Sequence, residues 1–269
     1  MHIAATTQAF QALHESGCFL LPNPWDVGSA KLLAGMGFQA VASTSSGFAW
    51  SRGRPDNNVS MHQVLDHLRE LTGAISIPVN ADFEGGFAVN VEDVFAHFAL
   101  AARTGVAGIS IEDSTGSSEN PLFDFALSVE RVRAARRAID ESQTGIVLTG
   151  RTEGFIVGRP DLTESLRRLV AYAEAGADCL YAPGIRSIDD LATVVKEVAP
   201  KPVNALVHAN FTTVAELADI GVRRISVGGA LARTAYSAFV HAAQEIQTSG
   251  TFGAFGARTA ATDFDSLFA

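Results

Sequence analysis

The sequence alternates eight times between a short apolar or β-branched run and a longer amphipathic stretch. Short apolar runs are typical of buried parallel strands, whereas apolar residues three or four apart are typical of helices. The expected strands are Cys18–Asn23, Ala40–Thr44, Pro78–Asp82, Gly108–Glu112, Ile146–Arg151, Cys179–Ala182, Pro202–Ala205 and Arg224–Val227. The expected helices are Ala30–Met36, Met61–Thr72, Val91–Thr104, Ser128–Glu141, Asp161–Ala175, Ile188–Val198, Thr213–Ile220 and Leu231–Gln247.

Glycines separate the expected helices from the strands that follow them. Gly37, Gly105, Gly176 and Gly221 each stand at such a junction. Glycine adopts the left-handed conformation that ends a helix at little cost, so these positions indicate a repeated α-to-β loop. A doubly wound sheet would have fewer strands and a Gly-rich nucleotide loop, and no GxGxxG follows the first strand. We therefore expect a single domain over residues 1–269, a (β/α)8 TIM-type barrel.

Composition excludes several classes of function. The formal net charge is -9, so the clustered Lys and Arg that a nucleic-acid backbone requires are missing. Cys18 and Cys179 lie in apolar runs and are expected to be buried structural residues. Neither a signal peptide nor a membrane-spanning stretch is apparent, so we expect a cytoplasmic protein with no membrane partner. The Gly- and Phe-rich segment 248–269 is expected to be an arm that packs on its own barrel or on a neighbour.

Polar residues gather where the expected strands end, which is where barrel enzymes place their catalytic groups. Asp82, Glu84 and Glu112 come from neighbouring strands and should converge in one cavity. Carboxylates so placed repel one another unless protons or a cation neutralise them. One solution is a hard divalent cation, Mg2+ or Mn2+, with oxygen ligands. The other, which the spacing leaves open, is a structural salt-bridge network with Arg151.

Other polar residues at these strand ends each have two interpretations. The segment Ser43–Gly47 presents amides to a developing oxyanion, or caps the barrel as a polar loop. Gly228–Gly229 binds phosphate, or forms an ordinary turn. His208 is a general base or a surface residue. Trp25 and Trp50 wall the pocket, or serve packing alone.

The order and spacing of several segments resemble the isocitrate lyase and phosphoenolpyruvate mutase superfamily across nearly the whole chain. The matching segments are Leu21–Asp26 with Ser29-Ala30, Ser46-Gly47, Gly53–Asp56, Pro78–Asp82, Gly108–Asp113, Arg151–Glu153, Glu174–Asp178 and Arg224–Gly229. The resemblance implies a barrel enzyme that forms a homotetramer, or a homodimer, in which paired subunits exchange the last helix. It also implies a Mg2+ ion that holds a 2-oxo-carboxylate or its enolate.

Strand-end position and resemblance together assign roles to the site residues. We expect the metal at Asp82, Glu84 and Glu112. The substrate is expected at Trp25, Ser45, Ser46, Gly47, Asp82, Arg151 and Asn204. Catalytic roles are expected for Asp56, Arg151, Glu153 and His208. Ser45 is a rival to the Ser46-Gly47 pair because the spacing from Gly47 to Asp56 is short.

The chain departs from the family pattern in three places. Asn80 stands where the metal strand usually carries a first Asp, so the site is less charged unless Glu84 compensates. The lyases that cleave isocitrate or methylisocitrate carry a Lys-x-Cys-Gly-His loop, whereas Ser114–Pro121 contains neither Cys nor His. Phosphonate-acting members carry Asn or Thr in this loop, and Asn120 falls near that position.

We therefore expect a Mg2+-dependent carbon–carbon lyase or decarboxylase that acts on a small 2-oxo-carboxylate or hydroxy-diacid, oxaloacetate-like, through an enolate. The expected proton donor is Glu153, His208 or a metal-bound water. One alternative is a carbon–phosphorus hydrolase or mutase acting on phosphonopyruvate. A second is a catalytically silent barrel that binds a 2-oxo acid, and a third is a barrel that handles phosphosugars.

Overall fold

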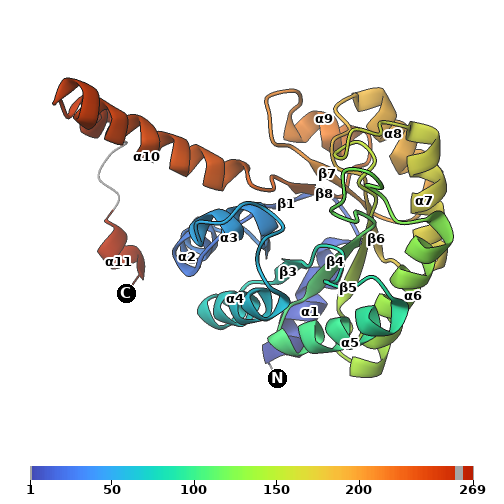
Figure 1. Ribbon diagram of the computed structural model, residues 1–269. Coiled ribbons are helices and arrows are strands. Elements are labelled where there is room, and N and C mark those ends of the chain that lie inside the picture. Colours follow the sequence, from blue (N-terminus) through green and yellow to red (C-terminus); the bar gives the residue numbers. More distant parts are fainter. Residues whose placement is uncertain (1, 258–262, 269) are drawn as a thin grey trace.

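All eight expected strands are present and run parallel in one sheet. The computed structural model describes residues 2–257 and 263–268, and Figure 1 shows the strands at the centre with helices packed around them. The strands are β1 Phe19–Leu21, β2 Val41–Ala42, β3 Val79–Asp82, β4 Gly108–Glu112, β5 Val147–Arg151, β6 Cys179–Tyr181, β7 Val203–Leu206 and β8 Arg224–Ser226.

The sheet curls into a nearly closed barrel. Its strand order is β1-β8-β7-β6-β5-β4-β3-β2, so β1 and β2 are the two edges. The Ala42 N–H donates to the Pro22 carbonyl over 3.0 Å, which joins these edges at their carboxyl ends. The expected (β/α)8 TIM-type fold is therefore confirmed, and all strand carboxyl ends face one mouth.

The helices alternate with the strands along the chain. They are α1 His2–Leu13, α2 Val27–Gly35, α3 Ser45–Ser51, α4 Met61–Ala74, α5 Val91–Ala101, α6 Phe125–Ser142, α7 Leu162–Glu174, α8 Ile188–Glu197, α9 Val214–Asp219, α10 Ala230–Ser249 and α11 Phe264–Phe268, with short 3-10 helices η1 Ala102–Thr104 and η2 Gly253–Ala257. Side-chain caps fix where several of them begin. Ser60 and Gln63 form a capping box at the start of α4, and Thr213 and Glu216 form another at α9.

Besides α11 in the C-terminal arm, two helices of the barrel, α1 and α3, were not expected from the sequence. Helix α1 precedes the first strand, and its fully buried Phe10 packs with Phe19 and Val147 at the end of the barrel opposite the mouth. Gly108 leaves room there, since a Cβ on it would lie 2.5 Å from the Phe10 ring. Helix α3 occupies the segment for which a loop was expected. The sequence did not indicate either helix because the large apolar residues of each form no continuous helical stripe.

The C-terminal part leaves the barrel. Helix α10 projects outward (Figure 1), and Ala232 is its only buried residue. Helix α11 returns to α2 of the same chain, where Lys31 Nζ donates to the Phe268 carbonyl over 3.2 Å. Part of the expected arm, 258–262 and 269, lies outside the described residues. Both cysteines are free, with Cys179 buried and Cys18 partly exposed. Across the described ranges, no helix has the length and apolar character to traverse a lipid bilayer.

Candidate active site at the mouth of the barrel

A cavity of about 550 Å³ opens at the carboxyl ends of the strands. Its polar lining includes Ser43–Ser46, Trp50, Asp56, Asn80, Asp82, Ser110, Arg151, Asn204, His208, Arg224 and Ser226–Gly229. A second hollow of about 410 Å³ lies beside it, under the loop that contains Ser114 and Pro121. Ser45, Asp56 and Arg151 line both, so the two hollows adjoin at these residues.

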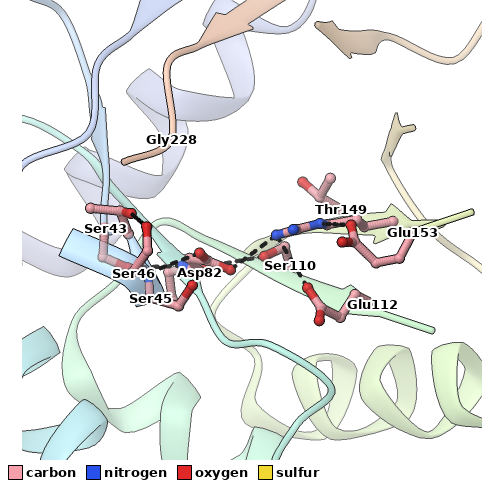
Figure 2. A network of polar contacts seen from close by, with 12 residues as sticks. Ser43, Ser45, Ser46, Asp82, Ser110, Glu112, Thr149, Glu153 and Gly228 are labelled. Carbon is pink, nitrogen blue, oxygen red and sulfur yellow. Dashed lines mark hydrogen bonds and ion pairs between the residues drawn. The ribbon is translucent and has the colours of Figure 1, made fainter. Parts of the chain in front are cut away.

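Arg151 is the centre of the charged residues at the mouth. Its Nη1 lies 3.3 Å from Asp82 Oδ1 and 3.2 Å from Glu112 Oε2, and its Nε donates to Glu153 Oε1. Figure 2 shows Asp82, Glu112 and Glu153 converging from the ends of β3, β4 and β5. The predicted convergence of Asp82, Glu112 and Arg151 is therefore found, in the form of the ion-pair network that the spacing had left open.

Negative charge exceeds positive charge around this guanidinium. Burial raises the pKa of Glu112 well above its usual range, against the opposing effect of Arg151. Burial also raises the pKa of Glu153, again opposed by Arg151. The pKa of Asp56 rises because it is buried and lies near Asp82. One arginine therefore cannot compensate every carboxyl group here, and the site favours added protons or an added cation.

Glu84 has the least satisfied carboxyl group of the cluster. Burial, together with the nearby charges of Asp82 and Asp56, raises its pKa to about 8. Its Oε1 is buried without a hydrogen-bond partner. Its backbone has φ of 48°, a left-handed conformation that is costly for a residue other than glycine. A buried, unpaired carboxyl oxygen held on a strained turn is a feature that a bound cation would explain.

These carboxylates fit a magnesium ion that is bound partly through water. Among the residues the structure describes, no three His, Cys, Asp or Glu side chains are grouped closely enough to bind a metal by themselves. Mg2+, however, usually keeps several waters and takes only one or two protein carboxylates. Asp82 and Glu112 are oriented toward one point, since both contact Arg151 Nη1. The donor set is thus compatible with Mg2+ or Mn2+ at Asp82 and Glu112, with Glu84 nearby.

The first turn of α3 forms the wall beside Asp82. Thr44 caps this helix, and the Ser45 N–H donates to Asp82 Oδ2 over 3.0 Å. The Asp82 N–H in turn donates to Ser43 Oγ over 2.9 Å. Ser46 Oγ lies 3.2 Å from Thr44 Oγ1, and Figure 2 shows Ser43, Ser45 and Ser46 grouped beside Asp82. The Ser45 amide therefore positions the carboxylate of Asp82, whereas the sequence analysis had assigned Ser45 to substrate binding.

Two residues expected to bind substrate are placed behind the cavity wall. Gly47 does not line the cavity, and a Cβ on it would lie 2.9 Å from Trp25 Cβ and 3.2 Å from Ala232 Cβ. Gly47 is thus required for close packing of α3 against Trp25 and α10. Trp25 supports this wall from behind, and Trp50 is the tryptophan that lines the cavity.

The remaining predicted residues lie at different depths. Asp56 reaches the cavity from the loop after α3. His208 lines its rim, 3.0 Å from Arg186 Nη2, and burial together with the charges of Arg186 and Arg233 lowers its pKa. Asn204 is buried inside the barrel, where its Nδ2 donates to Ser226 Oγ over 2.9 Å. Asp56, His208 and Asn204 therefore lie at the entrance, the rim and the interior of one cavity, respectively.

Two buried side chains that support the site were not singled out from the sequence. Asn23 Oδ1 accepts the N–H groups of Val227 and Gly228 over 2.9 and 2.8 Å, and its Nδ2 donates to the Ser43 carbonyl. It thereby ties the loop after β8 to β2. Its position at the end of β1 was the available signal, but polar residues at strand ends are common.

Asp113 supports Glu153 in a comparable way. Its carboxylate accepts from the Glu153 N–H over 2.8 Å, and also from Thr152, Arg168 and Tyr172. With all of these partners, Asp113 is a positioning residue that fixes the turn after β5. The sequence placed it at a strand end but could not identify its partners on α7.

Comparisons with known proteins agree with this geometry. The family model described as phosphoenolpyruvate phosphomutase matches residues 10–247. An uncharacterized protein of Mycobacterium tuberculosis is 31% identical over 88% of both chains. An oxaloacetate decarboxylase of Pseudomonas savastanoi pv. phaseolicola is 27% identical over 80% of this chain and 76% of its own. The crystal structure of a candidate lyase/mutase from Burkholderia cenocepacia J2315 superposes with a TM-score of 0.96 at 44% identity, over 100% of this chain and 98% of that one. The chain therefore belongs to the phosphoenolpyruvate phosphomutase family, and is an enzyme of the isocitrate lyase and phosphoenolpyruvate mutase superfamily that its motifs predicted.

Proposed function

We propose that this enzyme is a Mg2+-dependent carbon–carbon lyase or decarboxylase for a small 2-oxo-carboxylate or hydroxy-diacid of the oxaloacetate type. The observation that carries the proposal is the group of buried carboxyl groups that surrounds Arg151 at the mouth, more numerous than one arginine can neutralise. The 27% identity to an oxaloacetate decarboxylase supports the substrate class.

The chain's own residues bind and orient the reacting end of the substrate. Asp82 and Glu112 would hold Mg2+, or Mn2+ in its place, with Glu84 close by. When bound, the ion supplies positive charge against the negative charge that develops on the enolate oxygen. Arg151 adds a fixed guanidinium on the same side, and a buried charge of this kind acts strongly because water is excluded. Cleavage next to the carbonyl then requires no strong base, which suits a loop without Cys or His.

The enolate left after cleavage must gain a proton. Glu153 is suited to hold one because burial raises its pKa, and its place beside Arg151 directs it toward the cavity region. His208 is neutral at pH 7 because its pKa is lowered, so it can act only after it has taken up a proton. Asp56, with its raised pKa, lies across both hollows. The variants Glu153→Gln and His208→Gln distinguish Glu153 from His208 as the proton donor. Loss of the true donor should stop the release of protonated product.

A direct assay tests the proposal. Purified protein is incubated with oxaloacetate, with Mg2+ and with a chelator, and pyruvate is measured against the uncatalysed rate. We expect Mg2+-dependent pyruvate formation that falls at least about 100-fold in Asp82→Ala. The exposed Asp66, paired only with Arg69 on α4, provides the control Asp66→Ala, which should retain full activity. Activity that survives the chelator or the Asp82 substitution would contradict the mechanism.

Carbon–phosphorus chemistry on phosphonopyruvate is the second candidate. It is favoured by the family model and by a phosphoenolpyruvate phosphomutase of Streptomyces hygroscopicus, 26% identical over 90% of this chain. Phosphorus NMR on phosphonopyruvate distinguishes the two reactions, and Asn120→Ala should abolish activity only in the phosphonate case. Binding of metal and oxo acid in a calorimeter without turnover of either substrate would instead indicate a silent barrel.

We also propose that α10 is exchanged between paired subunits of a homotetramer or homodimer. Phe239 is 71% exposed on this projecting helix, and Tyr236, Val240 and Ile246 are also exposed. An apolar surface of this extent on a lone helix is costly in water. Sedimentation equilibrium should give at least a dimer for the wild type, and Phe239→Glu should shift the equilibrium toward monomers.

A further inference from the structure

Another arginine, Arg224, lies inside the barrel below the acidic cluster. It is 2% exposed. Its Nε donates to Asn204 Oδ1 over 2.9 Å and its Nη2 to Thr149 Oγ1 over 3.1 Å. Its Nη1 makes two longer contacts, 3.4 Å to His14 Nε2 and 3.5 Å to Asn80 Oδ1. The turn that follows α1 and three strands thus each contribute one acceptor to this guanidinium.

All of these acceptors are neutral. Asn204, Thr149 and Asn80 carry no charge, and His14 contacts Arg224 through a ring nitrogen whose partner, Nδ1, lies 2.7 Å from the Phe10 carbonyl. With Nδ1 as the donor to that carbonyl, Nε2 is free to accept from Arg224. In the part of the chain that is described, no Asp or Glu oxygen lies within 4.0 Å of the Arg224 nitrogens, whereas Arg151 has three carboxylate partners.

A buried guanidinium without a carboxylate is an unbalanced charge. Removing such a charge from water costs several kcal/mol, and only partly compensating neutral acceptors surround it here. The contacts use at most four of its five N–H groups, two of them at long distance. Arg224 therefore has both an uncompensated charge and hydrogen-bonding capacity left for an anion.

Arg224 borders the same cavity as the acidic cluster. It lines that cavity together with Asn80, Ser110 and Arg151. Thr149, which contacts Arg224, and Arg151 are two residues apart on β5. Two strand residues span roughly 6.6 Å, so the backbone of Arg151 lies about the length of a four-carbon diacid from that of the threonine that contacts Arg224.

We propose that Arg224 binds the second carboxylate of a dicarboxylate substrate, whose 2-oxo end lies at the mouth beside Asp82 and Arg151. This inference rests on the proposed function and specifies its substrate class. The three carboxylates already on Arg151 leave that residue poorly able to recognise another free anion, whereas Arg224 has no such competitor. A charge-assisted hydrogen bond in a dry interior discriminates strongly between a carboxylate and a methyl group.

Two acids that differ only at the far end provide the test. Oxaloacetate ends in a carboxylate and 2-oxobutyrate ends in a methyl group on the same carbon skeleton. Affinities are measured with Mg2+ by stopped-flow fluorescence before turnover, since Trp50, one of the two tryptophans in the chain, lines the cavity. The proteins are the wild type, Arg224→Gln, Arg224→Lys and the control Arg223→Gln. Arg223, on the preceding position, donates to the Gly17 carbonyl away from the cavity.

We expect the wild type and Arg223→Gln to bind oxaloacetate at least about tenfold more tightly than 2-oxobutyrate. Arg224→Gln should lose this preference with little change for 2-oxobutyrate, and Arg224→Lys should keep most of it because the charge remains. Equal affinity of the wild type for both acids would overturn the inference. So would an equal loss of both acids in Arg224→Gln and Arg224→Lys, which would show that Arg224 only braces the barrel.

The same data separate this inference from the proposed function. If the wild type binds 2-oxobutyrate without preferring the diacid, the Arg224 subsite is wrong and the 2-oxo-carboxylate site stands. If neither acid binds, the proposed function fails and the subsite fails with it.

Discussion

Two arginines of the cavity, Arg151 at the mouth of the barrel and Arg224 in the interior below it, here called the floor, lie in opposite electrostatic surroundings. At the mouth, Arg151 contacts Asp82, Glu112 and Glu153. At the floor, the acceptors that contact Arg224 within the described residues are neutral. The mouth therefore favours an additional cation and the floor an additional anion. A single cavity polarised in this way suits a metal-bound oxo acid that carries a second negative charge.

The largest expected effect comes from removing Arg151, the cation at the centre of the acidic cluster at the mouth. Arg151→Gln should lower kcat/KM for oxaloacetate on the order of 1000-fold, because a preorganised charge next to the developing enolate is lost. Steady-state kinetics measure this, with Arg167→Gln as the control. Arg167 is exposed on α7 and pairs with Glu164. A loss below tenfold would mean that Arg151 is only the centre of a structural salt-bridge network.

The second prediction concerns the neutral surroundings of the floor. Burial, with a further contribution from Arg224, lowers the pKa of His14 from 6.5 to about 3. Below pH 6.5 the unfolded chain therefore binds a proton at His14, whereas the folded chain does not. The stability that neutral His14 contributes is full above pH 6.5 and is lost as the pH falls toward 3. Between pH 7 and pH 4.5 the loss should reach about 2 kcal/mol, allowing for partial exposure.

Urea unfolding at pH 7 and pH 4.5 measures this effect. His14→Gln should reduce the acid-induced loss of unfolding free energy by that amount, whereas the exposed His62→Gln should leave it unchanged. The same acid sensitivity in the His14 variant and the wild type would contradict the lowered pKa of His14, and with it the expectation that the floor keeps this side chain neutral.

The smallest expected effect comes from giving the floor a carboxylate. Asn80→Asp places a negative charge beside Arg224, at the position of a contact that is now 3.5 Å. Oxaloacetate affinity should fall about tenfold because Arg224 gains an internal partner, and 2-oxobutyrate affinity should hold. The contrary result for Asn80→Asp is tighter metal binding with an unchanged affinity for oxaloacetate. That result would assign Asn80 to the mouth and contradict the division between mouth and floor.

The barrel and the acidic cluster were predictable because both follow from local rules. Eightfold alternation implies parallel strands, and parallel strands in a barrel bring Asp82, Glu112 and Arg151 to one end. Contacts across the interior were not predictable. The sequence shows that Arg224 begins β8, but it does not show that Asn80, Thr149 and Asn204 surround it.

Helix α3 illustrates the same limit. Its serines and glycine suggested amides presented to an oxyanion or a polar loop that caps the barrel, yet Thr44 caps a helix whose first amide binds Asp82. Trp25 was expected to bind the substrate and Trp50 was not, yet Trp50 lines the cavity, and packing against Gly47 places Trp25 behind the wall. Polar residues near a strand end therefore predict where a site lies, but they do not predict which side chains face it.

Manganese binding tests most directly the claim that the acidic mouth holds a divalent cation. Titration of the protein with Mn2+, followed by the electron paramagnetic resonance signal of free Mn2+, counts bound ions without requiring turnover. We expect one Mn2+ per chain, displaced by Mg2+, unchanged in Asp66→Ala and lost in Asp82→Ala. An unbound signal at every Mn2+ concentration with the wild-type protein, or equal binding by the Asp82 variant, would contradict that claim.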